Sequence, residues 1–191
     1  MKQKNSLNLF FILLLFTCTV LGQKNNANSH TITINTPEVA LISIHNSNSS
    51  INLEGNKITE AGKKVEFNSF DNNTWINYSS IIGSNTEPNR HVTIEVSEGN
   101  IPDGLNLIVK ANNDVGKGDG KVGKAIESNQ VLDNSPLKLI EGIGSCYTGV
   151  GINKGHNVSY SLKLSDDKNA YGKLDFDQSQ TIALTYTLSD N

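Results

Sequence analysis

Cysteine is scarce in this chain. The 191 residues include only Cys18 and Cys146. Cys18 belongs to an N-terminal stretch that has the features of a cleaved leader. A single remaining cysteine excludes an internal disulfide, so the protein must be held together by core packing or use the thiol of Cys146 between chains.

The common sequence motifs of enzymes are also missing. The chain has no Gly-x-Ser-x-Gly, no His-Glu-x-x-His, no P-loop and no dinucleotide fingerprint. Its four histidines are scattered, and none has metal-ligand spacing to another histidine or to Cys146. They are His30, His45, His91 and His156. We therefore expect a protein that is not an enzyme, with no catalytic residue, no cofactor and no metal.

Positive charge is in short supply as well. Lysine and arginine number 16 against 19 acidic residues, which gives a formal net charge of −3. No stretch of the sequence concentrates basic residues into a stripe. This balance makes nucleic acid an unexpected partner.

The N-terminal hydrophobic run is too short to span a membrane. Leu7–Leu15 is interrupted only by Asn8 and follows two lysines, whereas a transmembrane helix needs about 20 apolar residues. The pattern predicts a secretory signal peptide over residues 1–22. The remaining 169 residues then carry a formal charge of −5, and that length suits one domain.

Two fates of this leader lead to different locations. Cleavage before Gln23 gives a secreted or cell-surface protein with no membrane span, in which a polar segment, 23–29, precedes a single domain, 30–191. A lipid anchor on Cys18 is the alternative, although Phe16 and Thr17 match the usual residues before a lipidated cysteine poorly.

Amphipathic helical periodicity is absent, and alternation of hydrophobic and polar residues dominates. The segments predicted as strands are 31–44 with a break at Pro37, 51–53, 63–67, 74–80, 90–97, 105–111, 124–132, 136–140, 156–165 and 180–189. About ten short strands with regularly spaced turns predict an all-β, antiparallel β-sandwich, immunoglobulin-like or pilin-like. Residues 71–73 are expected to form a turn and residues 112–123 a flexible loop.

Five glycines lie between Glu141 and the last two strands. They are Gly142, Gly144, Gly149, Gly151 and Gly155. No Lys-Ser/Thr follows them, so they do not form a phosphate cradle. We expect them to shape a corner that needs positive φ or close backbone approach, with Cys146 and Tyr147 packed inside it.

Several residues could carry chemistry, but a structural role is favoured for each. Cys146 and His156 could form a nucleophilic pair, yet nothing in the sequence lowers the thiol pKa. The Asn112–Gly120 stretch, with Asp114 and Asp119, lacks the closing carboxylate of a calcium loop. The Asp166–Asp177 loop is a second acidic cluster to which the same reasoning applies. A cation at either place, or a hydrolase built on these aspartates, stays an open alternative.

A few aromatic residues could bind a sugar. Trp75 and Tyr78 lie on opposite faces of one predicted strand, so one should point to the core and the other away from it. A lone tryptophan in such a fold usually belongs to the core. Trp75 or Tyr147 would be the stacking residue of a carbohydrate-binding module.

Five segments carry a family resemblance. They are LGQ before the expected cleavage site, PEVALISI, TWINYSS, IGSCYTGVG and TIALTYTL. Through them the chain resembles short, secreted β-sandwich proteins of the Bacteroidota, a group with no established activity. The closing alternation of Ile182, Leu184, Tyr186 and Leu188 is similar to that of fimbrial subunits assembled by strand exchange, although the usual pilin disulfide is absent.

These observations favour a secreted or cell-surface, non-enzymatic, structural or adhesive protein, similar to a fimbrial-type subunit. Its expected partners are other copies of itself, or a surface polymer or glycan. Thr31–Ile44 is the candidate donor strand for exchange between subunits. The alternative is a carbohydrate-binding module, and a hydrolase is a more remote one.

Overall fold

The computed structural model describes residues 28–48, 50–83, 85–178 and 180–190. The chain divides into two units, Met1–Thr36 and Pro37–Asn191, and each is considered by itself. The predicted signal peptide, Cys18 and most of the polar segment 23–29 lie outside the described residues.

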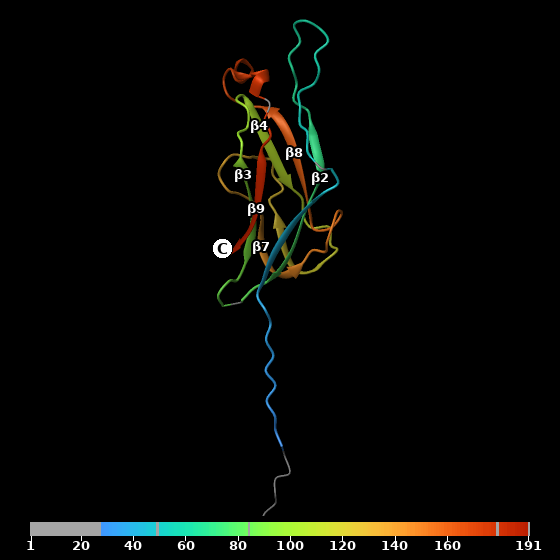
Figure 1. The fold of residues 1–191 in the computed structure, drawn as a ribbon, viewed down its shortest axis with the longest axis vertical. Coiled ribbons are helices and arrows are strands. Elements are labelled where there is room, and N and C mark those ends of the chain that lie inside the picture. Colours follow the sequence, from blue (N-terminus) through green and yellow to red (C-terminus); the bar gives the residue numbers. More distant parts are fainter. Residues whose placement is uncertain (1–27, 49, 84, 179, 191) are drawn as a thin grey trace, which may run out of the picture. The chain divides into compact units, whose positions relative to one another are not determined.

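The described residues of the larger unit form nine strands, and all pairs of neighbouring strands are antiparallel (Figure 1). The strands are β1 (Val39–Asn46), β2 (Phe70–Ile81), β3 (Arg90–Glu98), β4 (Leu105–Ala111), β5 (Asp119–Ala125), β6 (Gln130–Val131), β7 (Leu137–Tyr147), β8 (His156–Leu164) and β9 (Ala183–Asp190). Two short 3-10 helices, η1 (Ala170–Lys173) and η2 (Phe176–Gln178), precede β9. The described residues contain no α-helix, and the all-β prediction is confirmed.

Hydrogen bonds join all nine strands into one sheet. Its order is β6-β4-β8-β2-β7-β3-β9, with β1 added on β2 and β5 added on β7. The twelve-residue β2 links the two parts of this sheet. Its first half pairs with β8 and its last residues pair with β7, while β1 follows it from Thr74 to Ile81.

The core comes from the alternating faces of five of these strands. Its buried hydrophobic residues are Ile76, Tyr78, Val92, Ile94, Val96, Leu107, Val109, Ala111, Leu132, Leu139, Ile140, Ile143, Val158 and Tyr160. All but Leu132 lie on β2, β3, β4, β7 or β8. Burial of each large aliphatic side chain stabilises the fold by about 1.5–3 kcal/mol. This burial can hold the domain together although its described residues contain no disulfide.

Several predicted strands do not form. Residues 31–36, 51–53 and 63–67 belong to no strand. Around residues 51–67 the backbone N–H of Asn56 donates to the carbonyl oxygen of Glu66 at 2.8 Å, but one such bond does not make a ladder. Residues 71–73, predicted as a turn, lie inside β2, where the pairing with β8 shifts register between Asp71 and Thr74. The turn signal therefore marks a bulge.

The predicted flexible loop over 112–123 is wrong in its second half, because β5 begins at Asp119. This strand has little hydrophobic alternation and is instead rich in glycine. A Cβ atom on Gly120, at φ +88°, would lie 2.3 Å from the carbonyl oxygen of Ser145. Glycine lets β5 approach β7 closely. In the sequence, however, a glycine-rich stretch predicts a loop.

The glycine corner is smaller than expected. β7 continues through Gly142 and Gly144 to Tyr147, so the turn occupies only residues 148–155. Positive φ is confirmed at Gly142, Gly149, Gly151 and Gly155 but not at Gly144. Cys146 is half-buried and packs against the core, but it does so from β7 and does not fill the turn. Tyr147 does not fill the corner, since it is 53% exposed.

Candidate functional site

Residues 28–36 form an extended segment in which every residue is exposed (Figure 1). We call this segment the arm. Ile32 is 72% exposed and Ile34 is 87% exposed, and they alternate with threonines. Because side chains of an extended chain alternate between two sides, both isoleucines project to the same side. The arm thus has the pattern of a half-buried strand without the partner that would bury it.

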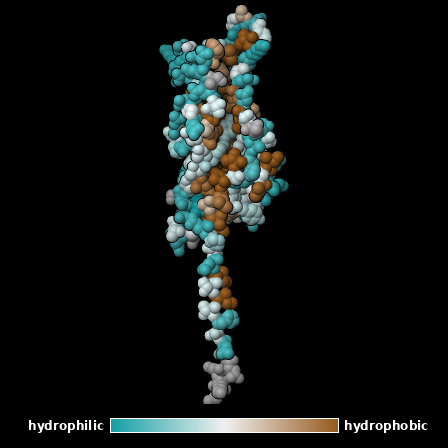
Figure 2. Space-filling view, in the orientation of Figure 1, coloured by the Kyte–Doolittle hydropathy of each residue, from teal (hydrophilic) through white to brown (hydrophobic). Residues whose placement is uncertain are grey.

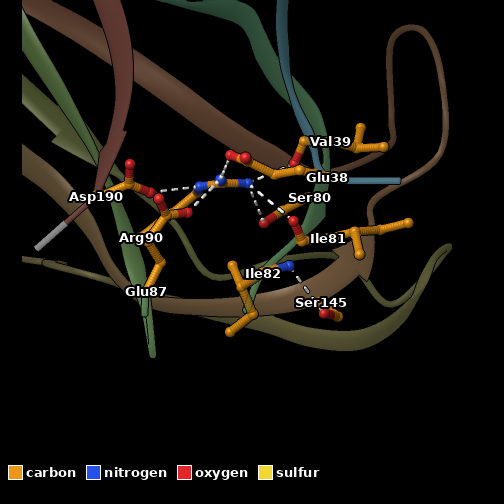
Figure 3. Close-up of polar contacts among 9 residues, drawn as sticks. All are labelled: Glu38, Val39, Ser80, Ile81, Ile82, Glu87, Arg90, Ser145 and Asp190. Atoms are coloured by element: carbon orange, nitrogen blue, oxygen red, sulfur yellow. Dashed lines mark hydrogen bonds and ion pairs between the residues drawn. The ribbon is translucent and has the colours of Figure 1, made fainter. Parts of the chain in front are cut away.

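The residues that follow the arm are fixed by a buried arginine. The side chain of Arg90, at the start of β3, is 1% exposed. Its Nε donates to Asp190 Oδ1 at 2.7 Å and its Nη2 to Glu87 Oε2 at 3.0 Å. The guanidinium also donates to a carboxylate oxygen of Glu38 and to the carbonyl oxygen of Val39 (Figure 3).

Two more acceptors complete the surroundings of this guanidinium. Arg90 Nη1 lies 3.4 Å from Ser80 Oγ and 3.4 Å from the carbonyl oxygen of Ile81 (Figure 3). Burial by itself lowers the pKa of Arg90, but the hydrogen bonds and charges of Asp190 and Glu38 outweigh it and raise the pKa above its usual value. Arg90 therefore stays cationic and joins the start of β1, the end of β2 and the end of β9.

β9 is an edge strand with an incompletely covered hydrophobic side. It pairs with β3 alone among the described strands. Leu184, Tyr186 and Leu188 pack against the core but remain only half-buried, as does Ile42 of β1. Figure 2 shows hydrophobic side chains gathered in the middle of the face that presents β9 and β1. An edge of this kind offers free backbone groups beside apolar side chains.

The Cys146–His156 pair does not have the properties of a nucleophile and its base. Burial, and then the negative charge of Asp114, raise the pKa of Cys146 to about 11, so the thiol stays protonated. His156 is fully buried, and burial lowers its pKa. Its Nδ1 lies 2.9 Å from the carbonyl oxygen of Asn112 and its Nε2 lies 2.7 Å from the hydroxyl of Tyr78. These bonds give His156 a structural role in the core.

The acidic loops do not converge on a site. Asp114 Oδ2 accepts the backbone N–H of Gly116, and Asp119 Oδ1 accepts that of Gly120. Asp167 pairs with Lys173 at 3.0 Å. Within the described part of the chain, no group of three or more His, Cys, Asp or Glu residues is placed to hold a metal ion.

A polar hollow lies on the sheet face opposite the core. It encloses about 320 Å³ over β2, β8 and β4. Its lining includes Phe70 and Asn72 of β2, Lys110 of β4, and Asn157 of β8.

Trp75 and Tyr78 divide between the two faces of β2 as expected, but the residue that reaches the core is not the tryptophan. Trp75 is only half-buried and lies on the face opposite Ile76 and Tyr78. The expectation that Trp75 belongs to the core is therefore wrong. Tyr78 is the core residue of the pair, at 3% exposure.

Sequence reasoning missed both Arg90 and the lining of this hollow. Arg90 stands at the start of a predicted strand, and nothing near it in the sequence announces partners 52 and 100 residues away. The hollow has a faint signal, because polar residues occupy every second position of β8. A pattern of that kind marks a solvent face, and only strand pairing shows which residues of different strands meet there.

Comparison with protein-family models, curated proteins and solved structures found no match for this chain. Among the described residues there is no helix that is both long and apolar enough to cross a membrane.

Proposed function

We propose that this protein is an exported, non-enzymatic surface subunit that assembles by donating its arm to another copy. The exposed alternation of Ile32 and Ile34 in the arm carries the proposal. Burying either isoleucine in a partner would contribute about 1.5–3 kcal/mol. An extended segment that adds to a sheet edge also gains a ladder of backbone hydrogen bonds.

The proposed donor strand is shorter than the expected segment Thr31–Ile44. Val39–Ile44, the second half of the expected donor Thr31–Ile44, pairs with β2 of its own chain as part of β1. Only residues 31–36 are then available to a neighbour. Glu38 and Val39, bound to Arg90, hold the adjoining residues of β1 in the parent domain.

We propose β9 as the acceptor edge. A strand placed beside β9 would find backbone groups that no described strand uses, and it would cover Leu184, Tyr186 and Leu188. The two-residue periods of the arm and of β9 agree, so Ile32 and Ile34 can face the same side as these three residues. Because donor and acceptor are different surfaces, such contacts extend into an open chain, as in a fimbrial-type polymer.

The same proposal includes a two-layered sandwich. One layer would hold β1, β2, β8, β4 and β6, and the other β5, β7, β3 and β9, joined where β2 passes from β8 to β7. The Tyr160 hydroxyl on β8 contacts the Tyr186 hydroxyl on β9, although three strands separate β8 from β9 in the sheet order. The Tyr78 hydroxyl likewise contacts the carbonyl oxygen of Val122 on β5. Both contacts support a sheet that folds back on itself.

Assembly can be tested with a pair of matched variants. Size-exclusion chromatography with light scattering should show polymers for the purified chain. Ile32→Asp with Ile34→Asp should give monomers, because two charges cannot be buried against Leu184 and Leu188. Thr33→Asp, on the other side of the arm, should keep the polymers.

The decisive comparison is between the isoleucine double variant and Thr33→Asp, which change opposite sides of the arm. Far-UV circular dichroism of all variants should coincide, since the substituted residues belong to the smaller unit, Met1–Thr36, and not to the unit that holds the core. A wild-type chain that is strictly monomeric at every concentration tested would refute the proposed assembly. So would equal polymer formation by the isoleucine double variant and by Thr33→Asp.

A further inference from the structure

The floor of the polar hollow is made by paired residues of two neighbouring strands. Lys110 of β4 lies opposite Ser159 of β8, and Ile108 lies opposite Ser161. These four residues alternate with core residues of the same two strands, which are Val109, Ala111, Val158 and Tyr160. Strand alternation therefore points the floor residues away from the core and into the hollow.

Asparagine side chains add polar groups around this floor. Asn157 Nδ2 donates to the carbonyl oxygens of Asn72 at 2.7 Å and Thr74 at 3.1 Å, which fixes its orientation. Its Oδ1 lies 3.4 Å from Asn112 Nδ2. The side chains of Asn72, Asn129 and Ser161 make no hydrogen bond to any residue that the structure describes. These amide and hydroxyl groups can each both donate and accept.

An aromatic ring stands beside the polar floor. Phe70, the first residue of β2, lies opposite Ser161 of β8 and is 61% exposed. Trp75 lies opposite Asn157 on the same pair of strands and is half-buried. An aliphatic ring with hydroxyl substituents is the ligand that matches such a surface, because its C–H face can pack on an aromatic ring while its hydroxyls bond to amides.

The charge of the hollow narrows the ligand further. Lys110 is the one charged residue in its lining within the described chain, and no carboxylate lines it. A single cation in a neutral polar hollow favours a ligand with one negative group. It does not supply the row of cations that a nucleic acid backbone requires.

We propose that this hollow binds a carboxylate-bearing sugar unit of a polysaccharide, such as a uronic acid. Phe70 packs against the sugar ring, Asn72 and Asn129 bond to its hydroxyls, and Lys110 pairs with its carboxylate. This site is independent of assembly through the arm, because it lies on the outward face of β2, β8 and β4 and involves neither the arm nor β9.

The test is a titration of the full chain with two sets of oligosaccharides, followed by NMR or calorimetry. Oligogalacturonides carry the carboxylate, and galacto-oligosaccharides of equal length do not. We expect the uronides to bind at least about fivefold more tightly, which corresponds to about 1 kcal/mol. Lys110→Met should bring the affinity for the uronides down to that for the neutral oligosaccharides.

Matched variants test the ring and the amide. Phe70→Ala and Asn129→Ala should each weaken binding by about tenfold or more. Phe176→Ala is the control for Phe70→Ala, because Phe176 is 91% exposed in η2 and does not line the hollow. Equal effects of the two phenylalanine variants would overturn the site, as would the absence of binding to both oligosaccharides. Equal affinity of the wild-type chain for the two would overturn the role of Lys110.

Discussion

At the scale of single residues, Arg90 connects parts of the sequence that are far apart. Its partners come from the start of β1, the end of β2, the loop before β3 and the end of β9. Glu38 and Asp190 are themselves 63% and 48% exposed, so water screens much of their attraction to the guanidinium. The hydrogen bonds to carbonyl groups should therefore matter more for stability than the ion pairs.

Replacing Arg90 with methionine should lower the free energy of unfolding by about 2 kcal/mol. The variant keeps most of the side-chain volume but leaves the carbonyl oxygens of Val39 and Ile81 without this donor. Lys63→Met is the control, because the Lys63–Glu60 pair is 66% exposed on both sides and should contribute less than about 0.5 kcal/mol. Urea unfolding measures both, and equal losses would show that burial of Arg90 has no special role.

His156 should make stability depend on pH. Burial lowers its pKa in the folded protein, whereas in the unfolded chain the pKa is about 6.5. Below that pH the unfolded state binds a proton that the folded state does not, so stability falls as the pH is lowered through about 6.5. Denaturant unfolding between about pH 7.5 and 5 should show this decrease, with a slope of up to about 1.4 kcal/mol per pH unit.

Two histidine variants show whether His156 is responsible for this pH dependence. His156→Gln should lose stability at neutral pH, where it gives up the bonds to Tyr78 and Asn112, but should depend less on pH. His30→Gln changes an exposed residue and should keep the wild-type pH profile. An unchanged profile in His156→Gln would contradict the assignment.

At the scale of elements, close approach of backbones decides where β8 begins. Gly155 precedes β8 with φ +70°, and a Cβ atom there would lie 2.1 Å from the carbonyl oxygen of Ile76. Gly142 in β7 has the same φ, but a Cβ atom at that position would have no neighbouring atom within 4 Å. A side chain at Gly142 would suffer only the strain of positive φ, whereas a side chain at Gly155 would also clash with β2.

Alanine at each of these two glycines measures that difference. Gly142→Ala should lose about 1 kcal/mol of stability from positive φ alone. Gly155→Ala should lose about 2 kcal/mol or more beyond that, because the clash pushes β8 away from β2. Thermal unfolding of both variants gives the comparison, and equal melting temperatures would show that β2 and β8 do not approach so closely.

The sequence predicts some strands better than others, because some are stabilised by buried side chains and others by close pairing of backbones. β4 forms at its predicted bounds, because Leu107 and Val109 alternate with polar residues and reach the core. β5 forms where a loop is predicted, since it pairs through a glycine-lined backbone and contributes few apolar side chains. Hydrophobic alternation in the local sequence indicates which side chains are buried. Close approach of two backbones depends on a partner strand that is distant in the sequence.

The candidate sites follow the same rule. The alternation that identifies the arm is local, so the sequence alone suggests a donor segment there. The Arg90 cluster and the hollow join residues from strands that are distant in the chain, and their assembly depends on the strand order β4-β8-β2 and on the ends of β1 and β9. Only that order shows that Asn72, Lys110 and Asn157 line the same hollow.

At the scale of the whole molecule, the environment of Cys146 bears on whether the proposed assembly is covalent through this residue. Cys146 lies in β7, half-buried, between Ser80 of β2 and Gly120 of β5. The side chain of Cys146 packs against the core, so two copies could bring these thiols together only if each turned away from its own core. The elevated pKa acts in the same direction, since the thiolate is the species that forms disulfides.

We therefore predict that assembly does not involve Cys146. A pKa of about 11 leaves about one thiolate in a thousand at pH 8, so alkylation by iodoacetamide should be about a hundredfold slower than for a free cysteine with a pKa near 9. Unfolding in urea should restore the fast rate. Polymers should persist in reductant and in Cys146→Ser, because strand addition depends on Ile32, Ile34 and backbone hydrogen bonds. If reductant dissolved the polymers, the thiol would be the link between subunits and the proposed role of the arm would be wrong.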